Sequence, residues 1–371
     1  MSKEKTKSIS LKQQVQPLKY SIGNDISKEK FDACISVIDS EQRVKVIASR
    51  TFDNLPWGFK EYYEWASNKC KMPIPVVFIM EATGIYYESL AFFLHKKGCY
   101  LSVVLPNKSK KYMQSIGFKS KNDKIDAKGL SRMAAEQCLE KWEAPDETVM
   151  NLRSITRQRE SLQEFKTQIN NQLLAYQCGE FKNPTIINQM ESTISLLNQQ
   201  IKETEVLVND EINKDEELKI KVENITQIKG VGNITVATVL AETNCFKYFK
   251  NSRQLVSYSG YDVIENQSGK HVGKTKISKK GNSHIRRIMH MPAFSVVSNN
   301  EPIFKALYER VFKRTNMKMK GYVAVQRKLL ELIYTLWKNE TKYDRNYLNK
   351  TSGNDEHKLL FPLGFEKTVI V

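Results

Sequence analysis

The sequence predicts a mixed α/β domain at the N-terminus, then an antiparallel coiled-coil hairpin, then a mainly α-helical C-terminal domain. Three observations predict this order. Apolar strand-like runs alternate with helical stretches over residues 20 to 105, aliphatic residues follow a helical stripe over residues 149 to 222, and glycines interrupt a helical texture over residues 225 to 338. The expected domains are a flexible basic arm at 1–18, the α/β domain at 19–148, the hairpin at 149–222, the C-terminal domain at 223–340 and a tail without assigned function at 341–371.

Residue spacing predicts the elements of the α/β domain. A period near two indicates strands, and apolar residues at i, i+3, i+4 and i+7 indicate a helix. The expected elements are strands at Tyr20–Ile26, Phe31–Asp39 and Arg43–Arg50, a helix at Phe59–Cys70, a strand at Pro75–Met80, a helix at Ile85–Lys97 and a strand at Tyr100–Leu105. Three antiparallel strands followed by strand, helix, strand and helix is an order compatible with an RNase H-like fold.

Two aliphatic stripes predict the hairpin. The first runs from Leu152 to Leu173 and the second from Ile187 to Ile201, with a break at Cys178–Pro184 between them. Two long helices around a turn predict an antiparallel coiled coil. An ordinary helical spacer and a dimerising arm are both compatible with this pattern.

Composition limits the classes of function. The 371 residues include 58 Lys and Arg against 41 Asp and Glu, a net charge of +17, and 40% of residues are hydrophobic, which excludes a wholly disordered basic chain. Such a surplus predicts a polyanion partner, with nucleic acid first and an anionic membrane second, although it could serve solubility alone. No apolar run approaches the ~20 residues of a membrane span, and no signal peptide is visible, so a cytoplasmic protein without a membrane partner is expected.

Cysteine spacing argues against disulfides and zinc. The six cysteines are scattered, and no two of them form a C-x-x-C pair. Unpaired, mostly buried thiols in a reducing compartment are therefore expected.

Four carboxylates have the spacing of a metal site. Asp25 lies in the first strand and Glu81 ends the Pro75–Met80 strand, while Asp123 and Asp126 share one helix face. If the first and fourth strands are neighbours, the four side chains converge, and hard oxygen ligands favour magnesium or manganese. Two such ions ~4 Å apart would stabilise phosphodiester transfer. The alternative is that Asp123 and Asp126 only cap a helix.

Basic residues and glycines near these motifs suit a phosphate backbone. Lys119 and Lys121 precede the aspartate pair, and Gly230 and Gly232 form a turn that resembles a helix-hairpin-helix element or is a plain inter-helix turn. A run without acidic residues follows Ser268, and a solvated basic loop is the alternative to a nucleic-acid contact. Its predicted nucleic-acid-binding residues are Lys270, Lys274, Lys276, Lys279, Lys280, Arg286 and Arg287.

Motifs over about residues 20 to 340 resemble the DEDD transposases of the IS-one-ten family, which includes the Piv-type invertases. The N-terminal blocks are Asn24-Asp25-Ile-Ser-Lys, Glu81-Ala-Thr-Gly-Ile-Tyr and Asp123-Lys-Ile-Asp126-Ala. The C-terminal blocks are the glycine turn, Tyr258-Ser-Gly, Ser268-Gly and Lys280-Gly-Asn-Ser-His-Ile-Arg-Arg.

The resemblance implies a RuvC-like N-terminal domain, a metal-bound set of four carboxylates, and a serine nucleophile in the C-terminal transposase domain. Ser268 matches that serine, with Ser259 and Ser278 as alternatives. It further implies a composite active site on DNA, a homo-oligomer (dimer or tetramer), a nucleoid location, and a bridge RNA as guide, which no residue shows directly.

The function expected is therefore that of a transposase or site-specific recombinase that cuts and joins DNA strands. Two alternatives stay open. One is a metal-dependent, structure-selective nuclease that hydrolyses DNA with Ser268 idle, and the other is a catalytically inactive nucleic-acid-binding protein.

Overall fold

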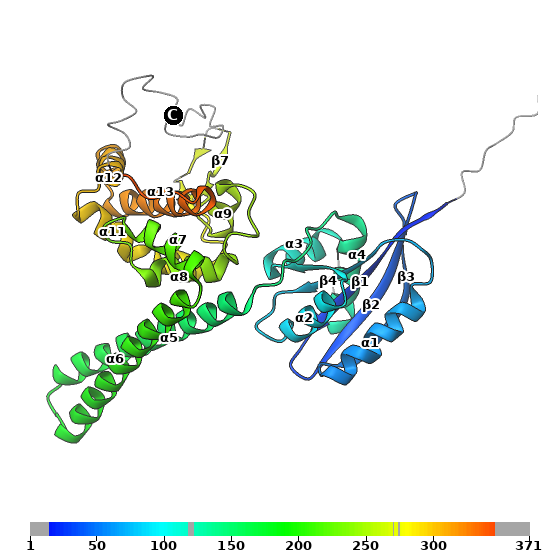
Figure 1. The fold of residues 1–371 in the computed structure, drawn as a ribbon, viewed down its shortest axis with the longest axis horizontal. Helices are drawn as coiled ribbons and strands as arrows, with labels where there is room; N and C mark the ends of the chain where they lie inside the picture. The colour runs from blue at the N-terminus through cyan, green and yellow to red at the C-terminus, as the bar shows by residue number, and fades with distance from the viewer. Residues whose placement is uncertain (1–14, 118–121, 270, 274, 346–371) are drawn as a thin grey trace, which may run out of the picture. The chain divides into compact units, whose positions relative to one another are not determined.

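The computed structural model describes residues 15–117, 122–269, 271–273 and 275–345 (Figure 1). The chain divides between Ala144 and Pro145 into two compact units. None of the helices in the described ranges combines the length and the apolarity that crossing a membrane requires.

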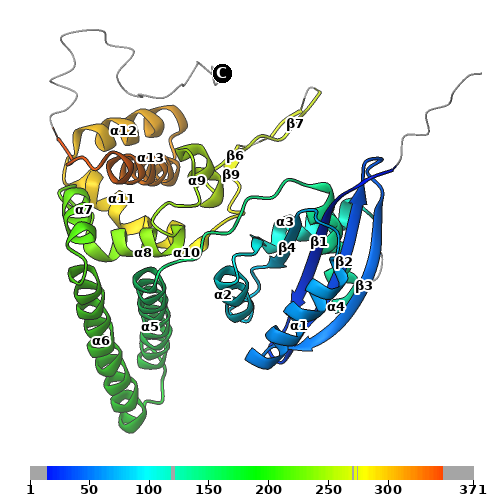
Figure 2. The same ribbon diagram turned by 45° about the vertical axis from the view of Figure 1, so that its right-hand side comes forward.

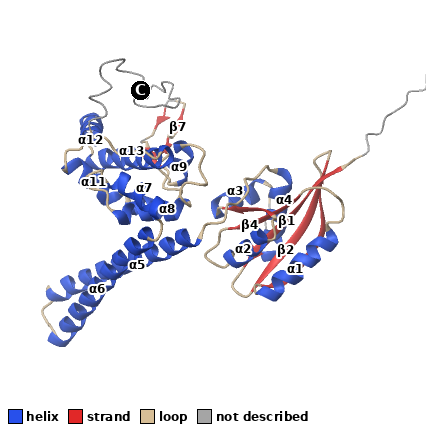
Figure 3. Ribbon diagram, viewed as in Figure 1, coloured by secondary structure: helices blue, strands red, loops and turns tan. Residues whose placement is uncertain are grey.

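The first unit contains a five-stranded mixed sheet in the order β3-β2-β1-β4-β5. Figure 3 shows strands of this sheet in red with helices in blue around them. Its strands are β1 (Pro17–Ile26), β2 (Lys30–Asp39), β3 (Val44–Asp53), β4 (Val76–Glu81) and β5 (Tyr100–Val104). β1, β2 and β3 pair antiparallel, whereas β4 pairs parallel with both β1 and β5. The mixed α/β class is confirmed, and so is the expected pairing of the first and fourth strands. β1 begins at Pro17, inside the stretch predicted as an arm.

Helices cover both faces of this sheet, as strand alternation requires. The helices are α1 (Pro56–Lys69), α2 (Glu88–Lys96), α3 (Pro106–Ser115) and α4 (Asp123–Glu136). In β4, Phe78 and Met80 belong to the apolar cluster that includes α1 and α2, whereas Ile79 belongs to the cluster with Leu130 and Met133 of α4. The central strands of the sheet are therefore buried between two helical layers, only one of which contains α4, whereas the edge strand β3 is mostly exposed.

The backbone of α4 lies directly on β1. A Cβ atom placed on Gly23 would lie 2.2 Å from both Ala127 O and Ser131 N, so only glycine fits there. Close by, Ser131 Oγ donates to Ser21 O at 3.0 Å and is 2.8 Å from Ser36 Oγ. α4 begins at its N-cap Asn122, whose Oδ1 accepts from Ile125 N at 2.8 Å. The glycine contact and the serine bonds together fix α4 against the sheet.

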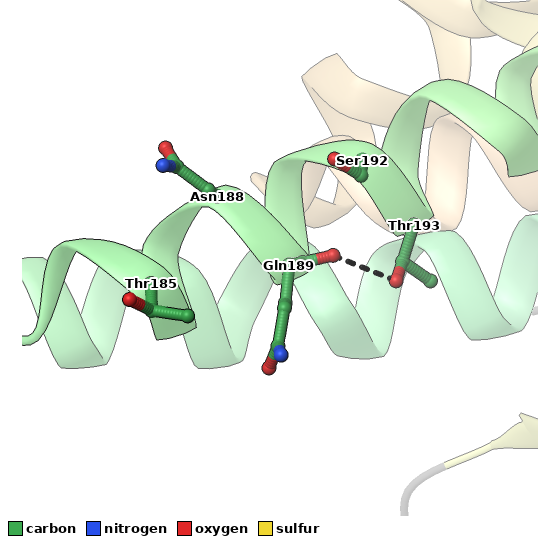
Figure 4. Close-up of a pocket in the computed structure, with 5 residues that line it drawn as sticks. All are labelled: Thr185, Asn188, Gln189, Ser192 and Thr193. Carbon is green, nitrogen blue, oxygen red and sulfur yellow. Dashed lines mark hydrogen bonds between the residues drawn. The ribbon is translucent and has the colours of Figure 1, made fainter.

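The second unit begins with two long helices that lie side by side, α5 (Glu147–Gln177) and α6 (Pro184–Asn213) (Figure 2). Leu162, Leu197 and Ile201 form a buried cluster between them. The first turns of α6 carry a polar face, in which Thr193 Oγ1 donates to Gln189 O at 2.8 Å (Figure 4). The expected helix pair and its turn are confirmed, while the coiled-coil assignment stays a prediction.

Seven further helices follow in the described part of this unit. They are α7 (Glu216–Thr226), α8 (Asn233–Thr243), α9 (Ser252–Tyr258), α10 (Ser283–Ile288), α11 (His290–Ser298), α12 (Pro302–Thr315) and α13 (Lys318–Asn339). α8 is buried along nearly its whole length and shares one apolar core with Leu152 of α5, Ile285 of α10 and Leu329 of α13. The mainly helical character expected of this region is confirmed.

A β-ribbon projects between α9 and α10, and the sequence did not predict it. β6 (Val263–Ile264) pairs antiparallel with β9 (Lys276–Ile277), and β7 (Gln267–Ser268) pairs antiparallel with β8 (His271–Val272). Strands of two residues are too short to show a period, so spacing could not reveal them.

The cysteines are free, as expected, but they are not mostly buried. Only Cys34 is buried, whereas Cys138 and Cys178 are exposed and the other three are intermediate. Cys138 follows the end of α4, and Cys178 lies at the turn between the two long helices, so their exposure follows from their place at element ends.

Replacement of Gly23 by alanine should strongly destabilise the first unit, because the added Cβ overlaps backbone atoms of α4 that cannot move without the helix. We expect a loss of about 1–3 kcal/mol or more in the free energy of unfolding, measured by urea denaturation. Gly232→Ala is the control, since no atom lies within 4 Å of the Cβ placed there. Equal stabilities of the two variants would contradict the close packing of α4 on β1.

Candidate active site

The four predicted carboxylates lie at one end of the first unit's sheet. The parallel register pairs Asn24 with Met80, and Asp25 and Glu81 are the next residues along β1 and β4. Asp123 and Asp126 belong to the first turn of α4, the helix that packs across β1 at Gly23. The carboxyl ends of two neighbouring parallel strands and the N-terminus of one helix therefore supply the four side chains.

The carboxylate charges act on one another. Burial, as the largest cause, and the charges of Asp126, Asp123 and Glu81 together raise the pKa of Asp25 from its ordinary value to about 7. Within the described ranges, no three His, Cys, Asp or Glu side chains form a ready metal-holding group. The carboxylates thus converge to within electrostatic reach without closing on a common point.

Glu81 is held by hydroxyl groups. Ser109 Oγ of α3 donates to Glu81 Oε2 at 2.6 Å, and Thr83 Oγ1 donates to Glu81 Oε1 at 3.0 Å. Ser109 is fully buried, so this contact fixes the orientation of the carboxylate. The sequence predicts neither hydroxyl as a partner of Glu81, since α3, which carries Ser109, shows no clear apolar stripe and Thr83 lies in a loop.

Asp32 is a fifth carboxylate that the sequence did not single out. It pairs directly with Asp25 in the antiparallel register of β1 and β2, so both side chains point to the same face. Asp32 is buried, Thr51 Oγ1 donates to its Oδ1, and its charge also raises the pKa of Asp25. Counting the register back from the β1–β2 turn is the signal that could have found it.

This donor set fits a hard divalent cation. Burial and neighbouring like charges both raise the pKa of Asp25, so a cation at this place would relieve the repulsion among the carboxylates. Carboxylate oxygens are the ligands that magnesium and manganese prefer. Lys119 and Lys121, predicted to contact phosphates here, lie outside the described residues.

Ser268 lies in the outer strand pair of the ribbon, opposite His271 in the register, and is exposed. Its two alternatives are less accessible. Ser259 is fully buried, and its Oγ has no hydrogen-bond partner among the described residues. Ser278 is half-buried, and its Oγ accepts from Lys280 N at 3.3 Å. Exposure thus favours Ser268 over the other two serines as a group that could meet a large substrate.

The base of the ribbon is fixed by a buried carboxylate. Glu242 of α8 receives two hydrogen bonds from Arg157, at 2.7 and 3.0 Å, and one from Asn282 Nδ2 at 2.7 Å. Burial raises the pKa of Glu242, but hydrogen bonds and charge from Arg157 outweigh burial and hold it below its ordinary value. Asn282 N also donates to Tyr258 O at 2.7 Å, which closes the ribbon between α9 and α10.

Two of the predicted nucleic-acid-binding residues make contacts inside the protein. Arg286 Nη1 donates to the carbonyl oxygens of Ser259, Gly281 and Asn282, at 2.9, 3.1 and 3.1 Å. Arg287 forms ion pairs with Glu160 and Glu164 of α5. Both arginines therefore have a structural contact that the charge pattern could not reveal.

The lysines of the same run differ from these arginines. Lys276, Lys279 and Lys280 are exposed on β9 and at the foot of the ribbon. Lys270 and Lys274 lie outside the described residues. The positive charge that the described ribbon offers to a partner therefore comes from lysine.

The glycine turn joins α7 to α8. Gly230 has φ +104°, and a Cβ placed there would lie 2.7 Å from Ser295 Cβ of α11. Both the left-handed backbone conformation and the lack of space for a side chain therefore require glycine. Gly232 is the N-cap of α8, and no atom lies within 4 Å of its Cβ position. The α8 N-terminus lacks a side-chain cap, which leaves it compatible with a phosphate, and the helix-hairpin-helix assignment stays a prediction.

Two family models match the chain. A transposase model, that of the DEDD transposases of the IS110 type, matches residues 22–176, and a model described as the transposase IS116/IS110/IS902 family matches residues 222–309. The first range contains the four carboxylates, and the second contains the glycine turn and the ribbon. The fold and the site thus define an enzyme of the DNA transposase and recombinase class, and transposases of the DEDD type are typically metal-dependent.

Similar proteins agree with this class. The pilin gene-inverting proteins of Moraxella bovis and Moraxella lacunata are each 28% identical over 327 residues, which cover 87% of this chain and 97% of the relative. The transposase for insertion sequence element IS1111A of Coxiella burnetii is 21% identical over 347 residues, with 87% of this chain and 90% of the relative covered. The chain belongs to the IS110 family of transposases, the IS-one-ten family that its motifs resemble.

Replacement of Asp25 by asparagine should change how stability depends on pH in metal-free buffer. The pKa of Asp25 is higher in the folded than in the unfolded state, so the folded state binds its proton more tightly. The free energy of unfolding therefore decreases as the pH rises from about 4 to about 7. Thermal unfolding in EDTA should show this loss in the wild type and a smaller one in Asp25→Asn. Magnesium should raise the midpoint of the wild type more than that of the variant.

Glu64→Gln, which removes an exposed carboxylate of α1, is the matched control and should follow the wild type. Identical pH and magnesium responses in Asp25→Asn and the wild type would contradict a cation site at Asp25.

Asn282→Ala should destabilise the second unit by about 1–3 kcal/mol, because Glu242 loses a hydrogen bond inside the protein. Asn282→Asp should cost more, since it places a second negative charge beside a buried one. Urea denaturation measures both, with Ser283→Ala at an exposed neighbouring position as the control. If Asn282→Asp were as stable as the wild type, Glu242 would not anchor the ribbon.

Proposed function

We propose that this transposase is a site-specific DNA recombinase that cuts and joins DNA strands, with a RuvC-like first unit and Ser268 as the nucleophile. The convergence of Asp25, Glu81, Asp123 and Asp126 carries the proposal. Four negative charges held close together repel one another without a cation, and cation-bound carboxylates suit phosphodiester chemistry.

In this proposal the four carboxylates hold magnesium or manganese. When bound, such ions supply charge that stabilises the attacking and leaving oxygens of a phosphodiester. The chain's own residues prepare the site: Ser109 and Thr83 orient Glu81, and the packing at Gly23 sets the position of the α4 aspartates. Asp32 adds negative charge beside Asp25 and so increases the attraction for a cation.

Ser268 would carry the covalent step. Its Oγ forms a bond to the phosphorus, the bond from phosphorus to the bridging sugar oxygen breaks, and the serine proton is lost as the sugar oxygen becomes a hydroxyl. The exposure of Ser268 on a projecting ribbon supports this role, because a DNA strand is a large substrate. Lys276, Lys279 and Lys280 would bind neighbouring phosphates and stabilise the added charge.

Partners beyond DNA follow from the family and from surface features. The net charge of +17 would accommodate a bridge RNA as well as DNA. Phe165, Leu174 and Phe181 are exposed on α5 and at the turn that follows it, and Phe181 is 91% exposed. Exposed apolar side chains at the end of a helical hairpin support a homo-oligomer, dimer or tetramer, formed through this arm.

A hydrolytic, structure-selective nuclease is the second candidate. The observation that favours it is that Asp25, Glu81, Asp123 and Asp126 all belong to the first unit. Metal-dependent hydrolysis needs no residue from the ribbon.

Ser268→Ala should abolish the covalent protein–DNA adduct on cognate element-end DNA, with a loss of more than about a hundredfold, because no other group replaces the nucleophile. Denaturing gel electrophoresis of labelled DNA measures the adduct. Ser259→Ala and Ser278→Ala are matched controls and should retain it. Ser259→Ala should also keep the fold, since its hydroxyl has no partner among the described residues.

Wild-type cleavage without any adduct would reject the recombinase and favour the hydrolytic nuclease. Cleavage by Asp25→Asn at the wild-type rate would reject both enzymes.

A further inference from the structure

Five aromatic rings form a ladder across α11, α13 and α12. His290 and Phe294 lie 4.9 Å apart between ring centroids, Phe294 stacks on Tyr322 at 3.7 Å, and Tyr322 lies 4.6 Å from Tyr308. Tyr308 then stacks on Phe312 at 6.0 Å with an interplanar angle of 7°. The two Phe and two Tyr rings are partly exposed, and His290 is exposed. These aromatic groups therefore reach the surface although they pack on one another.

One end of the ladder lines a groove. The groove has a volume of about 1470 Å³ and lies among α5, α8, α10 and α11. His290 and Phe294 line it together with Gly230 and Lys279. The ladder thus starts beside the glycine turn and beside Lys279 at the foot of the ribbon, a lysine that the proposed function assigns to phosphate binding.

The other end of the ladder reaches a basic segment, the α12–α13 corner, which we define as residues 310–320. This corner contains no Asp or Glu, and its cations are Arg310, Lys313, Arg314, Lys318 and Lys320. All five are exposed, and in the described part of the chain none of them forms an ion pair. The corner therefore differs from Arg287, whose charge is balanced by two glutamates.

The backbone of the corner adds to its positive field. Asn316 turns the chain with φ 51°, and α13 begins two residues later without an acidic residue in its first turn. The positive end of the α13 dipole therefore lies among the lysines. Met317 and Met319, 49% and 51% exposed, offer apolar surface between these charges.

We propose that the groove, the ladder and the α12–α13 corner form one binding track for an unpaired nucleic-acid strand. Lysine and arginine bind phosphates, and aromatic rings stack on bases, which a paired duplex has already stacked and hidden. This proposal rests on the proposed function and adds the class of partner that the second unit holds. The corner lies beyond residues 222–309, where the family model matches.

The charge contribution is tested with the full chain carrying Lys313→Gln, Arg314→Gln and Lys318→Gln together. The probes are a labelled single-stranded RNA, a single-stranded DNA of the same sequence and the corresponding duplex DNA, each measured by anisotropy over a salt series. Affinity for single strands should fall at least about tenfold. The slope of log affinity against log salt should decrease by about 0.7 per phosphate contact, hence by about 2 for three cations.

The matched control removes three exposed lysines of the first unit, by Lys60→Gln, Lys69→Gln and Lys71→Gln. It changes net charge equally, so its affinity for single strands should stay within about twofold of the wild type. A loss for RNA alone or for DNA alone identifies which strand the track prefers, and either result supports the proposal. Unchanged single-strand binding, or an equal loss for the duplex, overturns it.

The stacking contribution is tested separately with Phe312→Leu, which removes the last ring of the ladder but keeps an apolar side chain. Single-strand affinity should fall about fivefold with an unchanged salt slope, since stacking involves no counterion release. If the thermal midpoint is retained and affinity is unchanged, the rings only pack the three helices together, and the proposal fails.

These readouts are independent of the Ser268 adduct. Loss of the adduct in Ser268→Ala can stand whether or not the track exists, and the track can bind strands in a chain that forms no adduct.

Discussion

The contact between α4 and Gly23 determines where the carboxylates of the first unit lie. A helix normally packs on a sheet through side chains, but here backbone meets backbone, because β1 has no side chain at that position. The first turn of α4 is thereby brought to the end of β1, and its two aspartates come within electrostatic reach of Asp25. A bulkier residue at Gly23 would push α4 outward and separate the carboxylates before any ligand arrived.

The position of the four carboxylates at one end of the sheet could be expected from the sequence because it follows from the strand topology, while their role stays a prediction. Once β1 and β4 were expected to be neighbours, Asp25 and Glu81 had to lie at the same end of the sheet, and the i, i+3 spacing placed two aspartates on one helix face. Asp32 and Ser109 were not predicted. The position of Asp32 beside Asp25 depends on the antiparallel register of β1 and β2, and Ser109 lies on α3, a helix without a clear apolar stripe. The residues that contact or neighbour the motif carboxylates can therefore be identified only from the three-dimensional structure.

The second unit was harder to predict, because residue type does not reveal the partner of a charge. Arg286 and Arg287 are adjacent to each other in a basic run, yet one binds three carbonyl oxygens and the other two glutamates. Conversely, the sequence does not single out the cations of the α12–α13 corner as a binding surface. They are spread over two helix ends, and their aromatic neighbours come from three helices. The net charge of +17 is therefore a sum of structural and available charges, and only the structure separates them.

The ribbon that carries Ser268 has a consequence for motion. Its strands are two residues long, so few ladder hydrogen bonds hold the outer pair, whereas its foot is tied to buried Glu242 through Asn282. Local opening of the outer pair therefore needs far less free energy than opening of the foot, and backbone amides near Ser268 exchange with solvent long before those of the α8 core. Ser268 thus lies in a weakly held part of the ribbon, while the foot of the ribbon is fixed to a buried carboxylate.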